Sequence, residues 1–456
     1  MSRLIMLGMV IVRLLLAALL VHGLTACQVE SAEQTDTTSS DAETTSSDED
    51  DSTDDDSGPY EGYNLYNALN STTTYLVDND DTILHTWSSD YTPGLAYYLL
   101  ENGELLRTGS ADNDTFDSGG AGGIVQLLDW DSNVIWEYQY SSDSYLQHHD
   151  VEMLPDGHVL IIAWEMKTQS EAEAAGRDPS SMGDAELWPD SIIEVDPDTD
   201  EIVWEWHVWD HVIQDYDASK DNYGTVADHP ELVNLNYTMN TNADWNHINS
   251  VDYSEEYDQI LLSVHNFSEI WIIDHSTTSA EAAGHSGGDY GKGGDLLYRW
   301  GNPQTYDDGA SDDDQQLFVQ HDAEWIADDL PGAGNILIFN NGKGRSDSNY
   351  SSIEEIETPV NSDGSYTLSA THYGPEASAW SYVAETPTDF YAQSISSSQR
   401  LPNGNTLICN GPEGYFFEVT EDGETVWDYS AGNAVFRVDR YGVDYAGFDG
   451  TPLDDE

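Results

Sequence analysis

A two-part repeat is the feature that most constrains how this chain folds. One part is an aspartate turn that leads into a strand centred on tryptophan, found at 134–138, 202–206 and 425–429, with a partial copy at 296–300. The other is an apolar strand that follows a polar segment and a tight turn, found at 159–162, 336–338 and 406–408, with a divergent copy at 260–262. Internal repeats of this kind indicate a fold built from stacked or radially arranged units.

The repeating unit consists of short antiparallel strands. After Pro59 the sequence lacks long helical patterns, with residues 171–176 as the main exception, and its alternating runs are broken by Asp, Asn and Gly turns. Roughly 400 residues of such units predict an all-β protein, a β-propeller of six blades, because fewer blades would leave too much chain in each. A parallel β-helix would need shorter coils, and a two-sheet sandwich would not explain the repeat. The early strands at 74–77, 83–87, 96–100 and 104–106 are expected to form the outer parts of one sheet unit.

Three histidines stand at corresponding places in different repeats. His149 and His321 are each followed by aspartate, and His247 lies in Asp-Trp-Asn-His-Ile-Asn. In a propeller, equivalent positions lie at equal radius around one axis, so we expect these three side chains to share a pocket at the mouth of the central channel. The alternative is structural, since a histidine at a fixed repeat position can hold neighbouring strands by hydrogen bonds.

The densest cationic spot of the chain follows the strand at 336–339. The turn Asn-Asn-Gly-Lys-Gly-Arg places Lys343 and Arg345 close together in a chain with only 13 Lys and Arg against 87 Asp and Glu. Such a spot in a very acidic protein indicates a place that holds an anion. A glycine-rich hairpin turn with two solvated charges explains the same residues.

Three segments carry a resemblance to a known family. They are Asp-Trp-Asn-His-Ile-Asn-Ser at 244–250, Gln-His-Asp at 320–322 with the strand and cationic turn that follow it, and Arg-Leu-Pro-Asn-Gly-Asn-Thr-Leu-Ile at 400–408. Together they resemble the arylsulfotransferases, propeller enzymes that transfer a sulfuryl group from an aryl sulfate to a phenol without a nucleotide donor. The resemblance covers most of 60–429 in order. It implies small-molecule donor and acceptor substrates, and we expect neither a cofactor nor a metal.

The resemblance also implies roles for individual residues. The family reaction passes through a transiently sulfated histidine, with other histidines and an arginine around the transferred group. Carried over, His247 and His321 are the active-site histidines, and Arg345 is the arginine whose fork grips the sulfuryl oxygens. The candidate substrate-binding residues beside them are Asn249, Lys343 and Trp245. Core packing is the alternative role for Trp245.

One departure from the family pattern concerns a further histidine. The repeat position of His149 and His321 is occupied in the last copy by the serine run 396–398, and His372 is the nearest substitute by order. If no further histidine reaches the pocket, the alternative is a non-catalytic propeller that binds an anionic or aromatic ligand or a partner protein.

The N-terminal region indicates export. Residues 1–26 combine two arginines, a long apolar run and Leu-Thr-Ala before Cys27, which is typical of a lipoprotein signal peptide with lipidation of Cys27, the alternative being an uncleaved anchor. Residues 27–57 are almost wholly Ser, Thr, Asp and Glu, which predicts a disordered acidic tether. The β-propeller catalytic domain then comprises 58–456. We expect an extracytoplasmic protein held at a membrane only by its lipid.

The formal net charge of −74 is spread over the whole chain. Dispersed acidity predicts a halophilic protein and makes nucleic acid and anionic membrane surfaces poor partners. Acidic turns at 112–114 and 196–200 lack the glycine of a calcium loop, and the Gly-rich segment 287–295 lacks the spacing of a phosphate loop, so we interpret them as surface turns and a flexible insertion. Cys409 is the only cysteine besides Cys27, so no intrachain disulfide is expected once Cys27 is lipidated.

Overall fold

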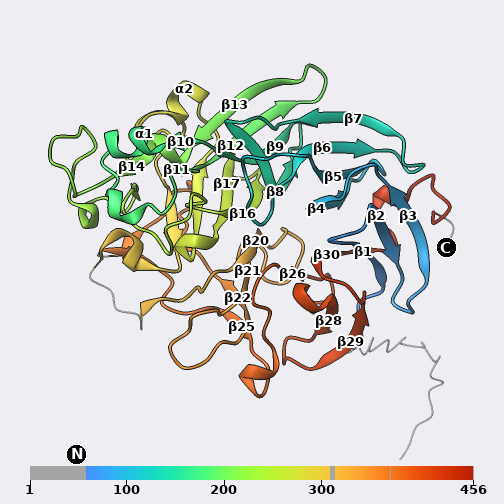
Figure 1. Cartoon of the computed structure of the whole chain (residues 1–456). Helices are drawn as coiled ribbons and strands as arrows, with labels where there is room; N and C mark the ends of the chain where they lie inside the picture. Colours follow the sequence, from blue (N-terminus) through green and yellow to red (C-terminus); the bar gives the residue numbers. More distant parts are fainter. Residues whose placement is uncertain (1–57, 309–313, 370, 455–456) are drawn as a thin grey trace, which may run out of the picture. The chain divides into compact units, whose positions relative to one another are not determined.

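The computed structural model describes residues 58–308, 314–369 and 371–454. Six four-stranded antiparallel sheets lie around a common centre and form a six-bladed β-propeller (Figure 1). The predicted fold is therefore confirmed. The predicted signal peptide, Cys27 and the predicted acidic tether lie outside the described residues. Within those residues, no helix is long and apolar enough to cross a membrane.

Five blades are each built from four strands that follow one another in sequence, apart from short inserted elements. Given from the innermost strand outward, blade 2 comprises β4 (Pro93–Leu99), β5 (Leu105–Ser110), β6 (Gly123–Leu128) and β7 (Val134–Gln139). Blade 3 comprises β8 (Tyr145–Met153), β9 (Val159–Glu165), β12 (Asp190–Asp196) and β13 (Glu201–His207). Blade 4 comprises β16 (Ile248–Ser254), β17 (Gln259–Val264), β18 (Glu269–Asp274) and β19 (Tyr298–Trp300). Blade 5 comprises β20 (His321–Trp325), β21 (Ile336–Asn340), β22 (Ser352–Ile356) and β25 (Trp380–Tyr382). Blade 6 comprises β26 (Ser397–Arg400), β27 (Thr406–Asn410), β28 (Tyr415–Val419) and β29 (Thr425–Ser430).

Blade 1 joins segments from both ends of the described chain. Its innermost strand is β30 (Val435–Gly442), followed outward by β1 (Gly62–Ala68), β2 (Thr73–Val77) and β3 (Ile83–Ser88). The pairing of β1 with β30 closes the ring, in antiparallel register with Asn64 opposite Arg440. The expectation that the early strands form one unit is wrong, because 74–77 and 83–87 lie in blade 1 whereas 96–99 and 105–106 lie in blade 2.

The two halves of the repeat correspond to different places in a blade. The apolar strands are the second strands, and β9, β17, β21 and β27 are buried almost throughout because neighbouring blades cover both of their faces. The tryptophan-centred strands β7, β13 and β29 are the outermost strands, with alternating exposure. Whether burial is continuous or alternates along a strand thus reflects how many of its faces are covered.

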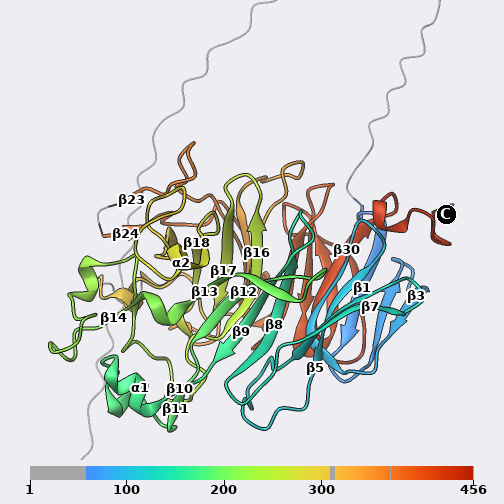
Figure 2. The same cartoon turned by 90° about the horizontal axis from the view of Figure 1, so that it is seen from above.

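Short elements are inserted between the blade strands. Among the described residues, the two α-helices are α1 (Gln169–Ala174) and α2 (Ser279–Ala282). Each begins with a capping box, formed by Thr168 with Glu171 and by Thr278 with Glu281. Figure 2 shows α1 beside β10 (Lys167–Thr168) and β11 (Glu186–Leu187) at one end of the blade strands. The other two-stranded sheets are β14 (Val212–Ile213) with β15 (Val233–Asn234), and β23 (Leu368–Ser369) with β24 (His372–Tyr373). The 3-10 turns include η2 (Val208–His211) and η4 (His265–Phe267).

Candidate functional site

Four histidine rings form a row across blades 3, 4 and 5. The centroid of His247 lies 4.5 Å from that of His149 and 4.9 Å from that of His265, and His265 lies 5.1 Å from His321. The structure therefore brings together His149, His247 and His321, as the repeat predicts. Phe436 of β30 lies 6.0 Å from His149 and 6.2 Å from His321, so it faces both ends of the row.

Irregular backbone positions these side chains. His149 and His247 have φ values of 52° and 57°, and Asp322, next to His321, has 52°. Register shifts interrupt β8 and β20 at these residues and β16 directly after His247. A bulge turns a side chain away from the ordinary pleat, and a non-glycine residue at positive φ costs on the order of 1–3 kcal/mol. Such strain gathers at functional sites, and here it recurs in three adjacent blades.

His247 forms a tight pair with Asp244. Its Nδ1 donates to Asp244 Oδ2 at 2.5 Å, and the same carboxylate oxygen accepts a hydrogen bond from Ser118 Oγ at 2.6 Å. Burial disfavours the charged ring, but the Asp244 carboxylate outweighs burial, so the pKa of His247 is raised. Nε2 of His247 makes no hydrogen bond to any described residue. This nitrogen is therefore available to a substrate.

His149 is held by a second histidine that the sequence analysis did not identify. The Nδ1 atoms of His148 and His149 lie 2.8 Å apart, so one carries the proton that the other accepts, and His148 Nε2 lies 2.9 Å from Asp190 Oδ1. Burial lowers the pKa of both rings well below the usual value, and the neighbouring His247 lowers that of His149 further. Both rings are thus neutral near neutral pH.

His265 and His321 are fixed by asparagines. His265 Nδ1 donates to Asn266 Oδ1 and His321 Nδ1 donates to Asn341 Oδ1, each at 2.8 Å. His321 Nε2 accepts the N–H of Ile395 at 3.2 Å, so both nitrogens of this ring are engaged. Burial lowers the pKa of His265 well below its usual value and that of His321 to about 3. The row therefore contains one basic ring, His247, among neutral ones.

His265 is the member of the row that sequence reasoning missed. It follows the second strand of blade 4, whereas the other three stand at the inner strands. A sequence signal for His265 was present, because the equivalent position after β21 holds another polar residue, Asn341, which accepts a hydrogen bond from His321. Polar residues directly after second strands therefore also face the channel mouth.

A cavity of about 610 Å³ opens beside His247. His247, Asp244 and Asn266 line it at the histidine row, and Trp188 adds an aromatic surface. Its wall also carries the carboxylates Asp117, Asp184 and Glu186. Its size suits a small aromatic molecule.

The cationic turn adjoins the row at Asn341, which accepts a hydrogen bond from His321. Lys343 is exposed, and its charge contributes to the lowered pKa of His265 after burial and the neighbouring histidines. The Arg345 guanidinium is engaged elsewhere: Nη2 donates to Ser352 Oγ at 2.7 Å and lies 3.9 Å from Glu354 Oε1. It also lies over the Tyr350 ring at 4.4 Å. Arg345 thus ties the turn to β22, and no described contact joins it to a histidine.

Two predicted substrate-binding residues are buried in the scaffold. Asn249 in β16 donates to the Gln320 carbonyl at 2.9 Å and so ties blade 4 to blade 5. Trp245 is 3% exposed, packs on Phe267 and donates to the Tyr237 carbonyl. Neither side chain lines the cavity.

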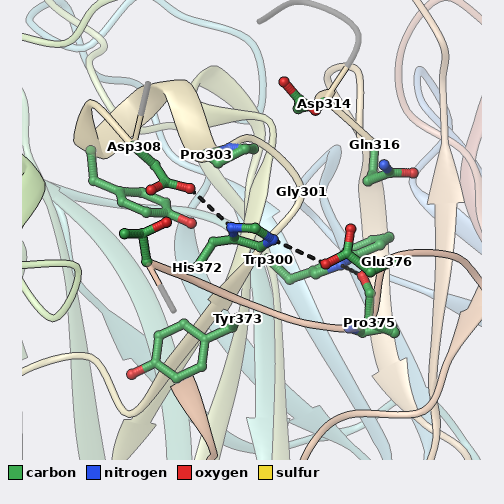
Figure 3. A pocket seen from close by; sticks show the side chains of 12 residues that line it. Trp300, Gly301, Pro303, Asp308, Asp314, Gln316, His372, Tyr373, Pro375 and Glu376 are labelled. Carbon is green, nitrogen blue, oxygen red and sulfur yellow. Dashed lines mark hydrogen bonds and ion pairs between the residues drawn. The ribbon is translucent and has the colours of Figure 1, made fainter. Parts of the chain in front are cut away.

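His372 lies in a different pocket, of about 500 Å³, shown in Figure 3. Its Nδ1 lies 3.0 Å from Asp308 and its Nε2 lies 3.2 Å from Glu376, and Trp300 and Tyr373 line the same pocket. No member of the histidine row lines it. Ser396 is buried with a φ of 94°, and its Oγ accepts the N–H of Gly411. The further histidines at the row are therefore His148 of β8 and His265 of η4, and neither position 372 nor position 396 contributes one.

Comparison with known proteins gives one extensive match. A family model described as Arylsulfotransferase (ASST) matches residues 97–432. None of the curated proteins searched matches the sequence. Among solved structures, a protein of unknown function from Bacteroides caccae shares 10% identity over 83% of this chain and 98% of its own, with a TM-score of 0.45. Virginiamycin B lyase from Staphylococcus aureus shares 10% identity over 83% of this chain and 86% of its own, with a TM-score of 0.38. Likenesses this weak carry no argument about chemistry.

Proposed function

The chain belongs to the arylsulfotransferase family, and we propose that it transfers a sulfuryl group from an aryl sulfate to a phenolic acceptor through His247. The observation that carries the choice of residue is the Asp244–His247 pair, which opens onto the 610 Å³ cavity and leaves Nε2 without a partner among the described residues. A histidine oriented by a carboxylate is a recurrent arrangement for nucleophilic and acid–base chemistry.

In the first half of the reaction, neutral His247 attacks the donor. Nε2 forms a bond to sulfur, the bond between sulfur and the aryl oxygen breaks, and the phenoxide leaves with that electron pair. The sulfated ring is positively charged as long as Nδ1 keeps its proton. Asp244, which accepts that proton's hydrogen bond, stabilises this charge.

In the second half, the acceptor phenol regenerates the enzyme. Its oxygen bonds to sulfur, the N–S bond breaks, and the electron pair returns to Nε2 of His247. The proton of the acceptor is lost to solvent, where it balances the phenoxide released from the donor. The neutral rings of His149 and His265 flank His247 and do not compete as cations for the anionic group.

The transferred group spreads negative charge over its oxygens and needs a cation. We propose that Lys343 supplies it, because Lys343 is exposed and its charge contributes to the lowered pKa of His265. The family resemblance assigns this role to Arg345. Because its guanidinium is engaged by Ser352 and Glu354, we propose that Arg345 supports the turn that presents Lys343.

The second candidate function is a propeller that binds an aromatic ligand without turnover. The carboxylates of Asp117, Asp184 and Glu186 in the cavity wall favour this alternative, because they repel an anionic donor and suit a neutral or cationic ring. The two functions therefore differ in what they do with an aryl sulfate.

A chromogenic aryl sulfate tests the proposal. The purified protein should release the phenol faster when a second phenol is present, and should form the sulfated second phenol in equal amount. Without an acceptor, the protein should gain the mass of one SO₃ group on a peptide that contains His247. His247→Ala should lower kcat by at least about 100-fold. The control is His85→Ala, which removes a half-buried ring that stacks on Trp130 outside the row, and it should keep its rate. Binding of the aryl sulfate without any turnover would favour the second function.

A further inference from the structure

A second cluster of histidine and aspartate lies outside the histidine row. It comprises His211 at the end of η2, His285 after α2, and Asp295 before β19. His211 Nδ1 and His285 Nδ1 lie 2.9 Å and 2.7 Å from Asp295 Oδ1. The three ligand atoms all lie within 4.8 Å of one another. They come from three segments that the sequence alone does not bring together.

The proton arrangement at His211 points to a cation. Nε2 of His211 lies 2.8 Å from the Ala282 carbonyl, which is only an acceptor, so Nε2 carries a proton. In the neutral ring, Nδ1 then presents its lone pair to the Asp295 carboxylate, which is also an acceptor. Two acceptors at hydrogen-bond distance need either an extra proton or a metal ion between them. A metal-bound histidine typically donates its second N–H to a carbonyl or carboxylate, as His211 does to Ala282.

The surroundings hold the buried ligand rigidly. The Trp206 ring stacks on His211 with 5.7 Å between centroids and 8° between planes, and Trp206 Nε1 donates to the Gly294 carbonyl. A Cβ at Gly294 would lie 2.0 Å from the Ala282 carbonyl oxygen and 2.6 Å from His211 Nε2, so this close approach requires glycine. His211 is fully buried, whereas the His285 side chain is 61% exposed. The cluster thus has a fixed inner ligand and an open outer side.

We propose that His211 Nδ1, His285 Nδ1 and Asp295 Oδ1 bind a divalent transition metal, with zinc as the best match. Two imidazoles and one carboxylate are a donor set that Zn²⁺ accepts, with water as the fourth ligand. Ligand bonds of about 2.0–2.1 Å require ligand atoms about 3.3 Å apart, so the cluster needs to widen by roughly half an ångström. The ion fixes the segment between α2 and β19, including its Gly-rich part, against the turn that follows β13.

Two neighbouring charged groups, Lys292 and Glu231, bear on the affinity of the cluster for a metal ion. Lys292 is close enough for Asp295 and Glu231 to oppose the lowering of its pKa by burial. We expect its ammonium to compete with a metal for Asp295. Because His229 also pairs with Glu231, at 2.9 Å, that carboxylate lies within a wider polar network.

The described residues contain one other group with metal-ligand spacing, Asp156, His158 and Glu194. Glu194 there also pairs with His275 at 3.0 Å, and burial of that ring is outweighed by Asp258 and Glu194, which raise the pKa of His275 to about 9. A cationic imidazole therefore already satisfies the carboxylate, which makes this group the poorer metal site.

Zinc binding to the full chain tests the proposal. The protein is stripped with a chelator and titrated with Zn²⁺ against a chromogenic competitor, in excess Mg²⁺ to occupy surface carboxylates. Wild type should bind one ion per chain at least about tenfold more tightly than His285→Ala. Because His285 is exposed, this variant removes a ligand without opening the core. His85→Ala, which removes a histidine of β3 outside the cluster and its charged neighbours, should bind as wild type does.

Cobalt gives a second readout that does not depend on affinity alone. Co²⁺ in a four-coordinate site with nitrogen ligands should produce visible absorption bands in wild type that are lost in His285→Ala. Equal zinc affinity in wild type and His285→Ala would overturn the proposal. Loss of binding in His158→Ala, with binding kept in His285→Ala, would also overturn it, because the ion would then occupy the other group.

Discussion

At the scale of the residue, the carboxylate that most raises the basicity of His247 is that of Asp244. Asp244 raises the pKa of His247 against the effect of burial, and the attacking form is the neutral ring. The kcat/KM for the donor should therefore rise with pH as His247 loses its proton. In Asp244→Asn the stabilisation of the charged ring is lost, so this rise should move to lower pH and the plateau should fall by about tenfold or more. Profiles of kcat/KM between pH 5 and pH 10 measure both effects.

The matched control removes a charge away from the site. Asp143→Asn, an exposed residue in the loop before β8, should leave the midpoint of the profile in place. A midpoint at the same pH in wild type and Asp244→Asn would show that His247 is not the group whose protonation limits the reaction.

Part of the site could be predicted residue by residue and part could not. His149, His247 and His321 could be placed together because a repeat puts equivalent residues at equal radius. The burial of Trp245 and the partners of Arg345 depend on side chains that are distant in the sequence, such as Phe267 and Glu354. His265 was missed because it follows a second strand, where the repeat has no common residue.

At the scale of the element, a buried ion pair links blades 6 and 1. Arg440 of β30 pairs with Glu418 of β28, both fully buried, and its Nε donates to Asn64 Oδ1 of β1 at 2.8 Å. Removing the guanidinium leaves a buried carboxylate without its cation. Arg440→Ala should therefore lower the free energy of unfolding by about 3–5 kcal/mol, measured by urea denaturation. The partly exposed pair of Lys220 with Asp217 provides the comparison, and Lys220→Ala should cost less than about 1 kcal/mol. Similar losses in the two variants would show that this pair does not stabilise the ring.

The element scale also shows where sequence patterns suffice. The second strands of blades 3 to 6 could be predicted because they are covered on both faces. The outer strands of blades 2, 3 and 6 could be predicted because they are partly exposed. Blade 1 could not be assembled from the sequence, since β30 and β1 show no local sign that they pair. The early strands were consequently assigned to one unit instead of two blades.

At the scale of the whole molecule, the charge of −74 predicts a dependence on salt. Repulsion among carboxylates destabilises the compact state, and it acts over a longer distance as ionic strength falls, since the screening length grows from about 3 Å at 1 M to about 30 Å at 0.01 M. The Tm of the protein should therefore fall as NaCl is lowered through this range. Sucrose at equal osmolality is the control, because it is excluded from the protein surface without screening charge. A Tm that does not change with NaCl would contradict the halophilic interpretation.

The closure of the ring by β30 has a consequence for the order in which the protein is made. Asn64 and Arg440 bond across 376 residues of sequence, so blade 1 is incomplete until nearly the whole propeller has been synthesised. Until then β1 presents an unpaired strand edge, which is a template for pairing with other chains. Contacts so distant in sequence also form slowly. The maturing protein therefore passes through a stage in which five blades can be complete while the first remains open, and protection of that edge is a requirement of its biogenesis rather than of its finished structure.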